Sequence, residues 1–482
     1  MFTLADMLSG VQPDGRQAAD SALARQIVLS EAAIDSRLVV PESLFVALAG
    51  ERVDGHAFVA AAAARGARAA LVRSDAIADL TIDRPVTRID SLTGAGIDGL
   101  TADSFVLVTV DAPLDALHRL AAFHRAKFRP LVVGITGSVG KTSTKEVTAA
   151  VLSRKYRTLK NPKSYNSEAT LPIVLLQLTE DHEVAVLEMG MHGQGEIAQL
   201  ANLARPLHGI VTNVGPSHLE RLGSMDAIQR AKSELVQALP AEGRAILNFD
   251  DERVRAMASA TQATPFFYGL DPAADLWADE IESRGMQGIA FRAHHAGESV
   301  TLKLPLIGRH SVHTALAATA AGLILGLGWD AIVDGLRDES AQLRLITVRG
   351  IRDTMLIDDT YNASPASSLA ALNLLDELDG RKIVVHGDML ELGELEEESH
   401  RRVGARASDV AAAIVAVGER ARWIAEEAEE SGMPPQHIYR CTSNREAIDI
   451  LRSLLAPGDV VLIKGSRGMA MEQIVSALQP TI

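Results

Sequence analysis

The chain has 482 residues, which is enough for about three domains at roughly 150 residues each. Hydrophobic residues make up 47% and charged residues 23%, as in proteins with packed cores. The net charge of −15 argues against binding to nucleic acid or to an anionic membrane surface, and the single cysteine, Cys441, excludes an internal disulfide framework and a multi-cysteine zinc site. No signal peptide or membrane-spanning run is recognisable, so a cytoplasmic protein without membrane insertion is expected.

Residues 1–128 predict a small α/β domain. An alternating run at 38–40 is broken by Pro41, and the apolar run at 44–48 predicts a buried strand. The alanine-rich segment 58–65 predicts a helix. Further strands are expected at 69–72 and 104–110, and a helix at 114–127.

The most informative stretch is LVVGITGSVGKTSTK, at residues 131–145. An apolar strand is followed by a glycine-rich turn and by a helix start that continues to Leu152, which is the geometry of a phosphate-binding loop. Lys141 would reach the β- and γ-phosphates of a nucleotide, and the Thr142 hydroxyl would bind Mg²⁺. The spacing differs from G-x-x-x-x-G-K-[ST] because Ile135 stands where the first glycine is expected. The predicted ATP-binding residues here are Gly137, Ser138, Val139, Gly140, Lys141, Thr142 and Ser143.

Polar residues follow three further apolar runs of the central region. Because the carboxyl ends of parallel strands form the ligand crevice of an open α/β sheet, these residues are expected to face the phosphate loop. Each has a simpler explanation when taken alone, since a carboxylate after a strand often caps a helix and a lone histidine often only packs. The strand at 184–190 carries Glu188, with His192 just beyond it; the strand at 209–214 is followed by His218, and the strand at 244–248 by Asp250 and Asp251. Lys232 lies on a predicted helix at 224–239.

The remainder of the chain predicts a β-rich insert, a core helix and a third α/β domain. The insert covers 276–304 and the helix 314–326. The acidic run 394–398 is interpreted as a solvated helix start rather than a metal site. In the third domain, strands are expected at 354–357, 382–386, 413–417 and 460–463, and a helix at 368–378.

These motifs together resemble the Mur ligases, which are ATP-dependent amide-forming enzymes of peptidoglycan precursor synthesis. The first domain carries DSRLVVPESLFVAL and GERVDGHAF. The second carries GITGSVGKTSTKE, LEMGMHGQGEI, VGPSHLERLGS and RAKSEL. The third carries DDTYNASPASSLAAL, HGDMLELGELEEESHRRVG and KGSRGM, which are the most specific of the set.

The resemblance implies three α/β domains, each of which binds a different substrate. Residues 1–128 would bind UDP-MurNAc-tripeptide, residues 129–334 would form a P-loop ATPase-type domain with a parallel sheet, and residues 335–482 would form a Rossmann-like domain that binds D-Ala-D-Ala. The implied reaction joins that dipeptide to the tripeptide through an acyl phosphate, with ATP and two Mg²⁺ ions. A monomer is expected.

The resemblance also implies roles for single residues, which we state as expectations. Lys141, Glu188, His218 and Lys232 would be catalytic; Thr142, Glu188, His218 and a carbamylated Lys232 would bind metal. Asn248, Arg344 and Asp359 would contact ATP; Ser36, Arg37 and His56 would lie near the UDP-linked substrate; Asn362, Asp388, Met389 and Glu391 would contact the dipeptide. The residue types alone favour plainer roles, namely an exposed helix lysine for Lys232 and turn chemistry for Ser36, Arg37 and His56.

The sequence departs from the usual family pattern at Ala169, Ser311, Thr314, Leu343 and His386, where Gly, Asn, Asn, Gly and Leu are more usual. Two other functions stay open at this point. One is a related ligase for a different acid–amine pair, although a folate-type enzyme lacks a comparable first domain. The other is a non-catalytic nucleotide-binding protein, for which loss of Lys141, Glu188, His218 or Lys232 would be the sign; all four are present.

Overall fold

The computed structural model describes residues 1–12, 21–50, 53–76, 81–338 and 346–480. The chain divides into two compact units, one of residues 1–134, 156–190 and 198–206, the other of residues 135–155, 191–197 and 207–482. In the described ranges the backbone forms sheets of five, nine and six strands and one small two-stranded sheet. Helices alternate with the mostly parallel strands, which confirms the predicted α/β class.

The five-stranded sheet lies in the N-terminal region, and all of its strand pairs are parallel. Its order is β3 (Ala32–Ala33), β4 (Leu44–Val46), β5 (Ala69–Arg73), β7 (Phe105–Val110) and β6 (Val86–Asp90). Both faces carry buried apolar side chains, so the central strands are nearly continuous hydrophobic runs. The helices are α1 (Leu4–Gly10), α2 (Ala22–Gln26), α3 (Val59–Ala64) and α4 (Pro113–Ala126), and β1 (Phe2–Thr3) pairs with β2 (Val28–Leu29).

The alternating run at 38–40 does not form a strand. Residues Ser36–Leu38 form a 3-10 turn, because the Asp35 carboxylate accepts the backbone N–H of Arg37 at 2.9 Å and caps it. The predicted strand that follows Pro41 is confirmed as β4.

The nine-stranded sheet has the order β16-β15-β14-β13-β12-β11-β8-β10-β9. Strands β11 to β14 pair in parallel, whereas β14, β15 and β16 form an antiparallel edge that confirms the predicted β-rich insert. The strands are β8 (Leu131–Thr136), β9 (Thr158–Lys160), β10 (Val184–Glu188), β11 (His208–Val211), β12 (Arg244–Asn248), β13 (Thr264–Gly269), β14 (Leu276–Ser283), β15 (Ile289–His295) and β16 (Glu298–Leu304).

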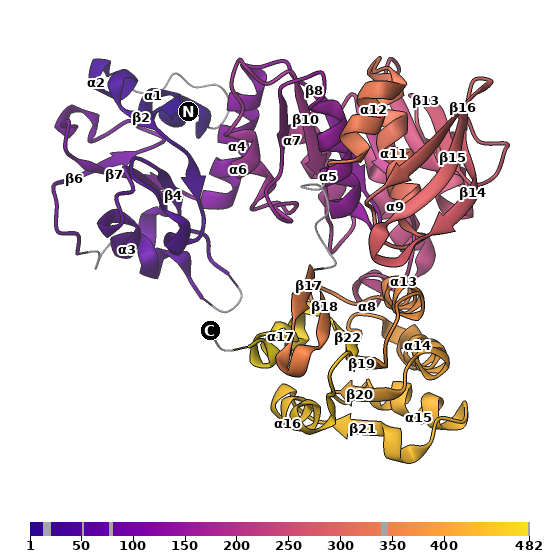
Figure 1. The fold of residues 1–482 in the computed structure, drawn as a ribbon. Helices are drawn as coiled ribbons and strands as arrows, with labels where there is room; N and C mark the ends of the chain where they lie inside the picture. The colour runs from indigo at the N-terminus through magenta and orange to yellow at the C-terminus, as the bar shows by residue number, and fades with distance from the viewer. Residues whose placement is uncertain (13–20, 51–52, 77–80, 339–345, 481–482) are drawn as a thin grey trace. The chain divides into compact units, whose positions relative to one another are not determined.

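Helix α5 (Lys141–Leu152) follows the glycine-rich loop and packs against α11 (Ser311–Ile324) and α12 (Trp329–Leu336) (Figure 1). Helix α11 begins three residues before its predicted start, so the unusual Ser311 and Thr314 lie in its first turn. The Ser311 hydroxyl donates to the Ile307 carbonyl at 2.6 Å. The other helices of this region are α6 (Leu171–Leu175), α7 (Glu196–Ala204), α8 (Leu219–Leu222), α9 (Met225–Gln237) and α10 (Glu252–Ala256).

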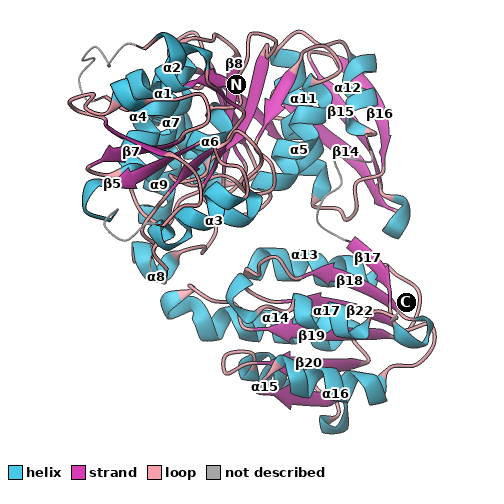
Figure 2. Cartoon of the chain, turned by 90° about the vertical axis from the view of Figure 1, so that its left-hand side faces the viewer, coloured by secondary structure: helices cyan, strands magenta, loops and turns pink. Residues whose placement is uncertain are grey.

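The six-stranded sheet of the C-terminal region has helices on both faces (Figure 2). Only its edge strand β17 pairs in antiparallel fashion. The order is β17 (Ile346–Arg349), β18 (Met355–Asp359), β22 (Val460–Lys464), β19 (Lys382–Gly387), β20 (Ala413–Val417) and β21 (Ile438–Cys441). The helices are α13 (Pro365–Asp376), α14 (Glu396–Val410), α15 (Arg422–Glu430), α16 (Asn444–Leu454) and α17 (Glu472–Leu478).

His386, another unusual residue, lies fully buried on β19. Its Nε2 is 2.9 Å from the Ser368 hydroxyl, and its Nδ1 is 2.7 Å from the Gly387 carbonyl. Burial lowers the pKa of His386 to about 3, so the ring is neutral at pH 7 and takes part in core packing. None of the helices in the described ranges combines the length and the apolar character needed to cross a bilayer.

Candidate active site

The glycine-rich loop joins β8 to α5 and requires its glycines. Gly137 has φ of 150°, and a Cβ there would lie 1.9 Å from the Thr212 hydroxyl oxygen. Gly140 has φ of 83° and is the N-cap of α5. The loop therefore presents backbone N–H groups at a helix N-terminus, where the helix dipole also favours an anion.

A polar segment that follows β11 braces this loop. The Asn213 side-chain oxygen accepts the Val139 N–H at 2.9 Å, while the Asn213 amide and the Thr212 hydroxyl donate to the Val139 carbonyl at 2.9 and 2.7 Å. The Ser138 hydroxyl accepts the Gly215 N–H at 2.8 Å and lies 2.9 Å from the Gly215 carbonyl. These bonds fix the loop backbone before any ligand arrives.

The same bonds explain why β11 is shorter than the predicted strand. The apolar pattern continues to Val214, but β11 ends at Val211. Thr212 and Asn213 turn their side chains toward the phosphate loop, and the Val214 N–H donates to the Asp251 carboxylate at 2.8 Å, so the strand does not continue. Sequence reasoning missed Thr212 and Asn213 as site residues; their only signal was that two polar residues interrupt an apolar run.

Lys141 is the first residue of α5, and its ammonium lies over the loop. Nζ donates to the carbonyls of Gly137 and Ser138 at 2.8 and 3.3 Å. The next residue, Thr142, is buried, and Ser143 is half-buried. The arrangement places one positive charge and one hydroxyl where the sequence predicts contacts with phosphate and metal.

Glu188 ends β10 and is 1% exposed. The Asn166 amide donates to its carboxylate at 2.6 Å, and Asn161 exchanges two hydrogen bonds with its backbone, at 2.7 and 3.0 Å. Asn166 is itself held, because its carbonyl accepts the Gly190 N–H at 2.8 Å. Sequence reasoning missed both asparagines, which fix the orientation of the carboxylate.

Replacing Asn166 with alanine should raise the Mg²⁺ concentration needed for half-maximal activity by about 10- to 100-fold, the usual effect of removing a group that orients a metal ligand. A magnesium titration of the ATP-dependent activity measures this shift. Asn202→Ala, at an exposed position of α7, is the control. An unchanged magnesium requirement in a folded Asn166 variant would show that the amide does not position Glu188 for metal binding.

Lys232 lies on α9 and is 2% exposed. In the described part of the chain, no carboxylate lies within ion-pair distance of its amine. Burial, together with the nearby charge of Lys141, lowers the pKa of Lys232 well below its usual range. The structure therefore contradicts the plain interpretation of Lys232 as an exposed helix lysine.

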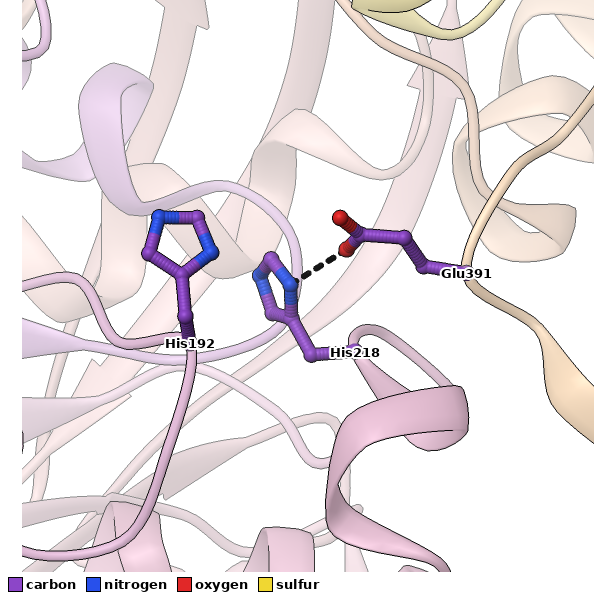
Figure 3. A group of neighbouring side chains, drawn as sticks. All are labelled: His192, His218 and Glu391. Carbon is purple, nitrogen blue, oxygen red and sulfur yellow. Dashed lines mark ion pairs between the residues drawn. The ribbon is translucent and has the colours of Figure 1, made fainter. Parts of the chain in front are cut away.

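His218 is the N-cap of α8 and has a left-handed backbone, with φ of 58°. Its Nδ1 lies 2.5 Å from a carboxylate oxygen of Glu391, and its ring packs edge-on against His192 at a centroid distance of 5.0 Å (Figure 3). Burial lowers the pKa of His218, although the Glu391 carboxylate acts in the opposite direction. The ring is thus available as a neutral nitrogen ligand.

Two of the three further residues predicted to contact ATP lie in the described ranges. The Asn248 amide donates to the Thr212 carbonyl at 2.9 Å and so supports the segment that braces the phosphate loop. The Asp359 carboxylate accepts from the buried Lys464 amine at 2.6 Å. Arg344 lies outside the described residues, so its predicted contact stays a prediction.

The residues predicted for the UDP-linked substrate have local partners. Arg37 is exposed and pairs with Asp35 at 2.6 Å, whereas Ser36 is buried. His56 is buried, with Nδ1 2.6 Å from Asp54 and Nε2 accepting the Arg73 N–H at 2.9 Å. In this structure Nε2 of His56 joins the turn before α3 to the end of β5, while Nδ1 contacts Asp54 within the turn.

The four residues predicted for the dipeptide differ in exposure. The Asp388 carboxylate accepts the N–H groups of Arg420 and Ala421 at 2.9 and 2.8 Å, and the Met389 side chain is fully buried. Asn362 is exposed and Glu391 is half-buried. Substrate contact at these positions stays a prediction, and at Met389 it would involve backbone rather than side chain.

Three family descriptions match successive segments of the chain. "Mur ligase family, catalytic domain" matches residues 28–125, "Mur ligase middle domain" matches 135–322, and "Mur ligase, glutamate ligase domain" matches 343–467. The UDP-N-acetylmuramoyl-tripeptide–D-alanyl-D-alanine ligases of Bacillus subtilis and Escherichia coli are 34% and 36% identical to this chain in sequence. Each alignment covers 94% of both chains. The chain belongs to the Mur ligase family.

Solved structures agree with this membership of the Mur ligases. A crystal structure of MurF from Acinetobacter baumannii has a TM-score of 0.78 at 30% identity and 98% coverage of both chains. MurF from Thermotoga maritima in complex with ADP has a TM-score of 0.74 at 25% identity, covering 95% of this chain and 98% of that one. The resemblance inferred from the motifs is confirmed, as is the three-domain Mur ligase fold; the exact boundaries at 128 and 334 stay predictions.

Proposed function

We propose that this Mur ligase joins D-alanyl-D-alanine to UDP-MurNAc-tripeptide and so forms UDP-MurNAc-pentapeptide for peptidoglycan synthesis. The observation that carries the proposal is the full-length similarity to ligases with this name at 34–36% identity. The alternative of a non-catalytic nucleotide-binding protein would leave the burial of Lys232 and the hydrogen bond that orients Glu188 unexplained.

The proposed reaction has two steps. In the first, the γ-phosphoryl group of ATP passes to the terminal carboxylate of the tripeptide, which gives an acyl phosphate and ADP. In the second, the free amine of the dipeptide attacks the acyl carbon and gives up a proton, the amide bond forms, and inorganic phosphate leaves with the C–O electron pair. Such phosphoryl transfer depends on positioning and on charge neutralisation.

Different residues of this chain would position the phosphates, neutralise charge and bind the metal ions. The N–H groups at the start of α5 would hold the phosphates, because those of Ser138 and Val139 already donate to Asn213. Lys141 would neutralise charge on the transferred group. Thr142, Glu188 and His218 supply hydroxyl, carboxylate and imidazole donors that fit divalent metal binding, with Asn166 holding the carboxylate in place. Bound Mg²⁺, as two ions, would supply positive charge to the phosphate oxygens.

A carbamate on Lys232 is part of the proposal. The modification requires a neutral amine, and burial lowers the pKa of this lysine. A carbamate would give the site an anionic oxygen donor of the kind that Mg²⁺ prefers. It would also offset the positive charge of Lys141 nearby.

The remaining assignments complete the proposal. Residues 1–128 would bind the UDP-linked substrate through the region of Ser36, Arg37 and His56, residues 129–334 would bind ATP, and residues 335–482 would bind the dipeptide near Asn362, Asp388, Met389 and Glu391. Asn248, Asp359 and Arg344 would complete the ATP site. We further propose a cytoplasmic monomer, since the UDP-linked substrate is a soluble nucleotide sugar.

The test is ADP release by the purified full-length protein with ATP, Mg²⁺ and UDP-MurNAc-tripeptide. ADP release should depend on the further addition of D-Ala-D-Ala, and mass spectrometry should detect the pentapeptide. Free D-alanine and L-Ala-L-Ala serve as alternative amines. Turnover with another amine but not with D-Ala-D-Ala would replace this function by that of a related ligase, and no turnover with any of them would refute it.

A further inference from the structure

Three metal-ligating side chains from separate loops converge in the second unit (Figure 3). His192 follows β10, His218 begins α8, and Glu391 lies between β19 and α14. One potential ligand atom from each residue lies within 4.8 Å of the other two. The proposed binding of ATP and of the dipeptide assigns no role to His192.

The contact between His218 and Glu391 is short but does not have the geometry of a hydrogen bond. Nδ1 of His218 lies 2.5 Å from the Glu391 carboxylate, yet its angles do not fit a hydrogen bond, so this buried nitrogen has no hydrogen-bond partner in the described residues. Beside it lies the second imidazole, His192. One carboxylate and two imidazoles thus place their potential ligand atoms within 4.8 Å of one another.

The backbone holds the ligands independently of any ion. The Glu220 N–H, two residues after His218, donates to the Glu391 carbonyl at 3.2 Å. The His192 N–H donates to the Glu196 carboxylate at 2.8 Å, which fixes its loop to the start of α7. These bonds hold the segments that carry the three side chains without a bound ion.

We propose that His192, His218 and Glu391 form a binding site for a divalent transition-metal ion of the zinc class. Two imidazole nitrogens and one carboxylate oxygen are a donor set that suits Zn²⁺, whereas Mg²⁺ prefers oxygen ligands. Ligands of one tetrahedral zinc ion lie roughly 3.3 Å apart, given bonds of about 2.0 Å, so the Glu391 carboxylate would move back slightly from its present contact. A fourth position would remain for water.

This site would regulate the enzyme, a consequence that rests on the proposed function. His218 is also a proposed ligand for catalytic Mg²⁺. A zinc ion bound by His192, His218 and Glu391 would therefore make the His218 imidazole unavailable to Mg²⁺. The same ion joins the loop of Glu391 to the segment 218–222. Zinc should therefore inhibit ligation, and His192 should be required for the inhibition but not for ligation itself.

Direct zinc binding tests the site without reference to catalysis. Full-length protein without a histidine tag is titrated with Zn²⁺ against a chromophoric chelator, in the absence of nucleotide. Wild-type protein should take up one tightly bound ion per chain, and His192→Ala should weaken binding by at least about tenfold. His437→Ala, an exposed histidine of the C-terminal region, is the matched control and should bind as wild type does.

X-ray absorption at the zinc edge provides the second measurement and should show two imidazoles in the wild type and one in His192→Ala. Equal affinity of wild type and His192→Ala, or a bound ion without imidazole scattering, would overturn the proposal. Because His192 is exposed, its loss should not impair folding. If zinc binds as expected but no ligation is found, the proposed function fails while the metal site stands.

Discussion

Replacing Lys141 with alanine should lower the rate of ADP release by about 10³-fold or more, while the fold and the binding of the UDP-linked substrate remain. The ammonium lies over the loop, 2.8 Å from the Gly137 carbonyl, at the N-terminus of α5. During phosphoryl transfer it would neutralise charge on the transferred group. That contribution is lost in the variant, whereas the bonds of Asn213 and Thr212 continue to hold the loop.

The comparison needs a lysine whose loss should not matter. Lys303 is exposed on β16, in the antiparallel edge of the central sheet. Lys303→Ala should match the wild-type rate, and circular dichroism with thermal melting should show that both variants fold. A folded Lys141 variant that releases ADP at nearly the wild-type rate would remove this lysine from the mechanism.

Local sequence pattern determined much of the fold. Strand β8, helix α5 and the carboxylate at the end of β10 lie where the apolar runs and the glycines predict them. The exceptions have long-range or capping causes. Thr212 and Asn213 leave the strand pattern because the partner of their side chains, Val139, lies in the phosphate loop, more than 70 residues away. Residues 36–38 form a turn because the Asp35 carboxylate caps it.

In the candidate site too, some residues could be predicted from local sequence pattern and others could not. The charged residues proposed to contact phosphate and metal, Lys141 and Glu188, were recognisable by type and position. Asn161 and Asn166 were not, because an asparagine in an irregular stretch gives no sign of which group it will orient. His192 was noticed only as the residue beyond a strand, since its neighbour Glu391 is about 200 residues away in sequence.

Replacing Lys232 should also cause a large loss of activity. Lys232→Ala should be nearly inactive in ADP release, and short carboxylic acids such as acetate or propionate should restore part of the activity. The reason is that the lysine is fully enclosed, its pKa is lowered by burial, and no carboxylate in the described residues lies within ion-pair distance of its amine. A neutral buried amine can react with CO₂ to form a carbamate, and a small carboxylate in the cavity left by the truncation would replace that anion.

A matched variant separates this explanation from a general loss of packing. Methionine at position 232 fills the same space without an amine, so Lys232→Met should be inactive, folded and insensitive to added acids, because no cavity admits them. Addition of ¹³C-bicarbonate to the wild-type protein should give a carbamate signal in the carbon NMR spectrum, and both variants should lack it. Wild-type activity without that signal, or equal rescue of the two variants, would mean that Lys232 acts as a plain amine and that the metal ligand lies elsewhere.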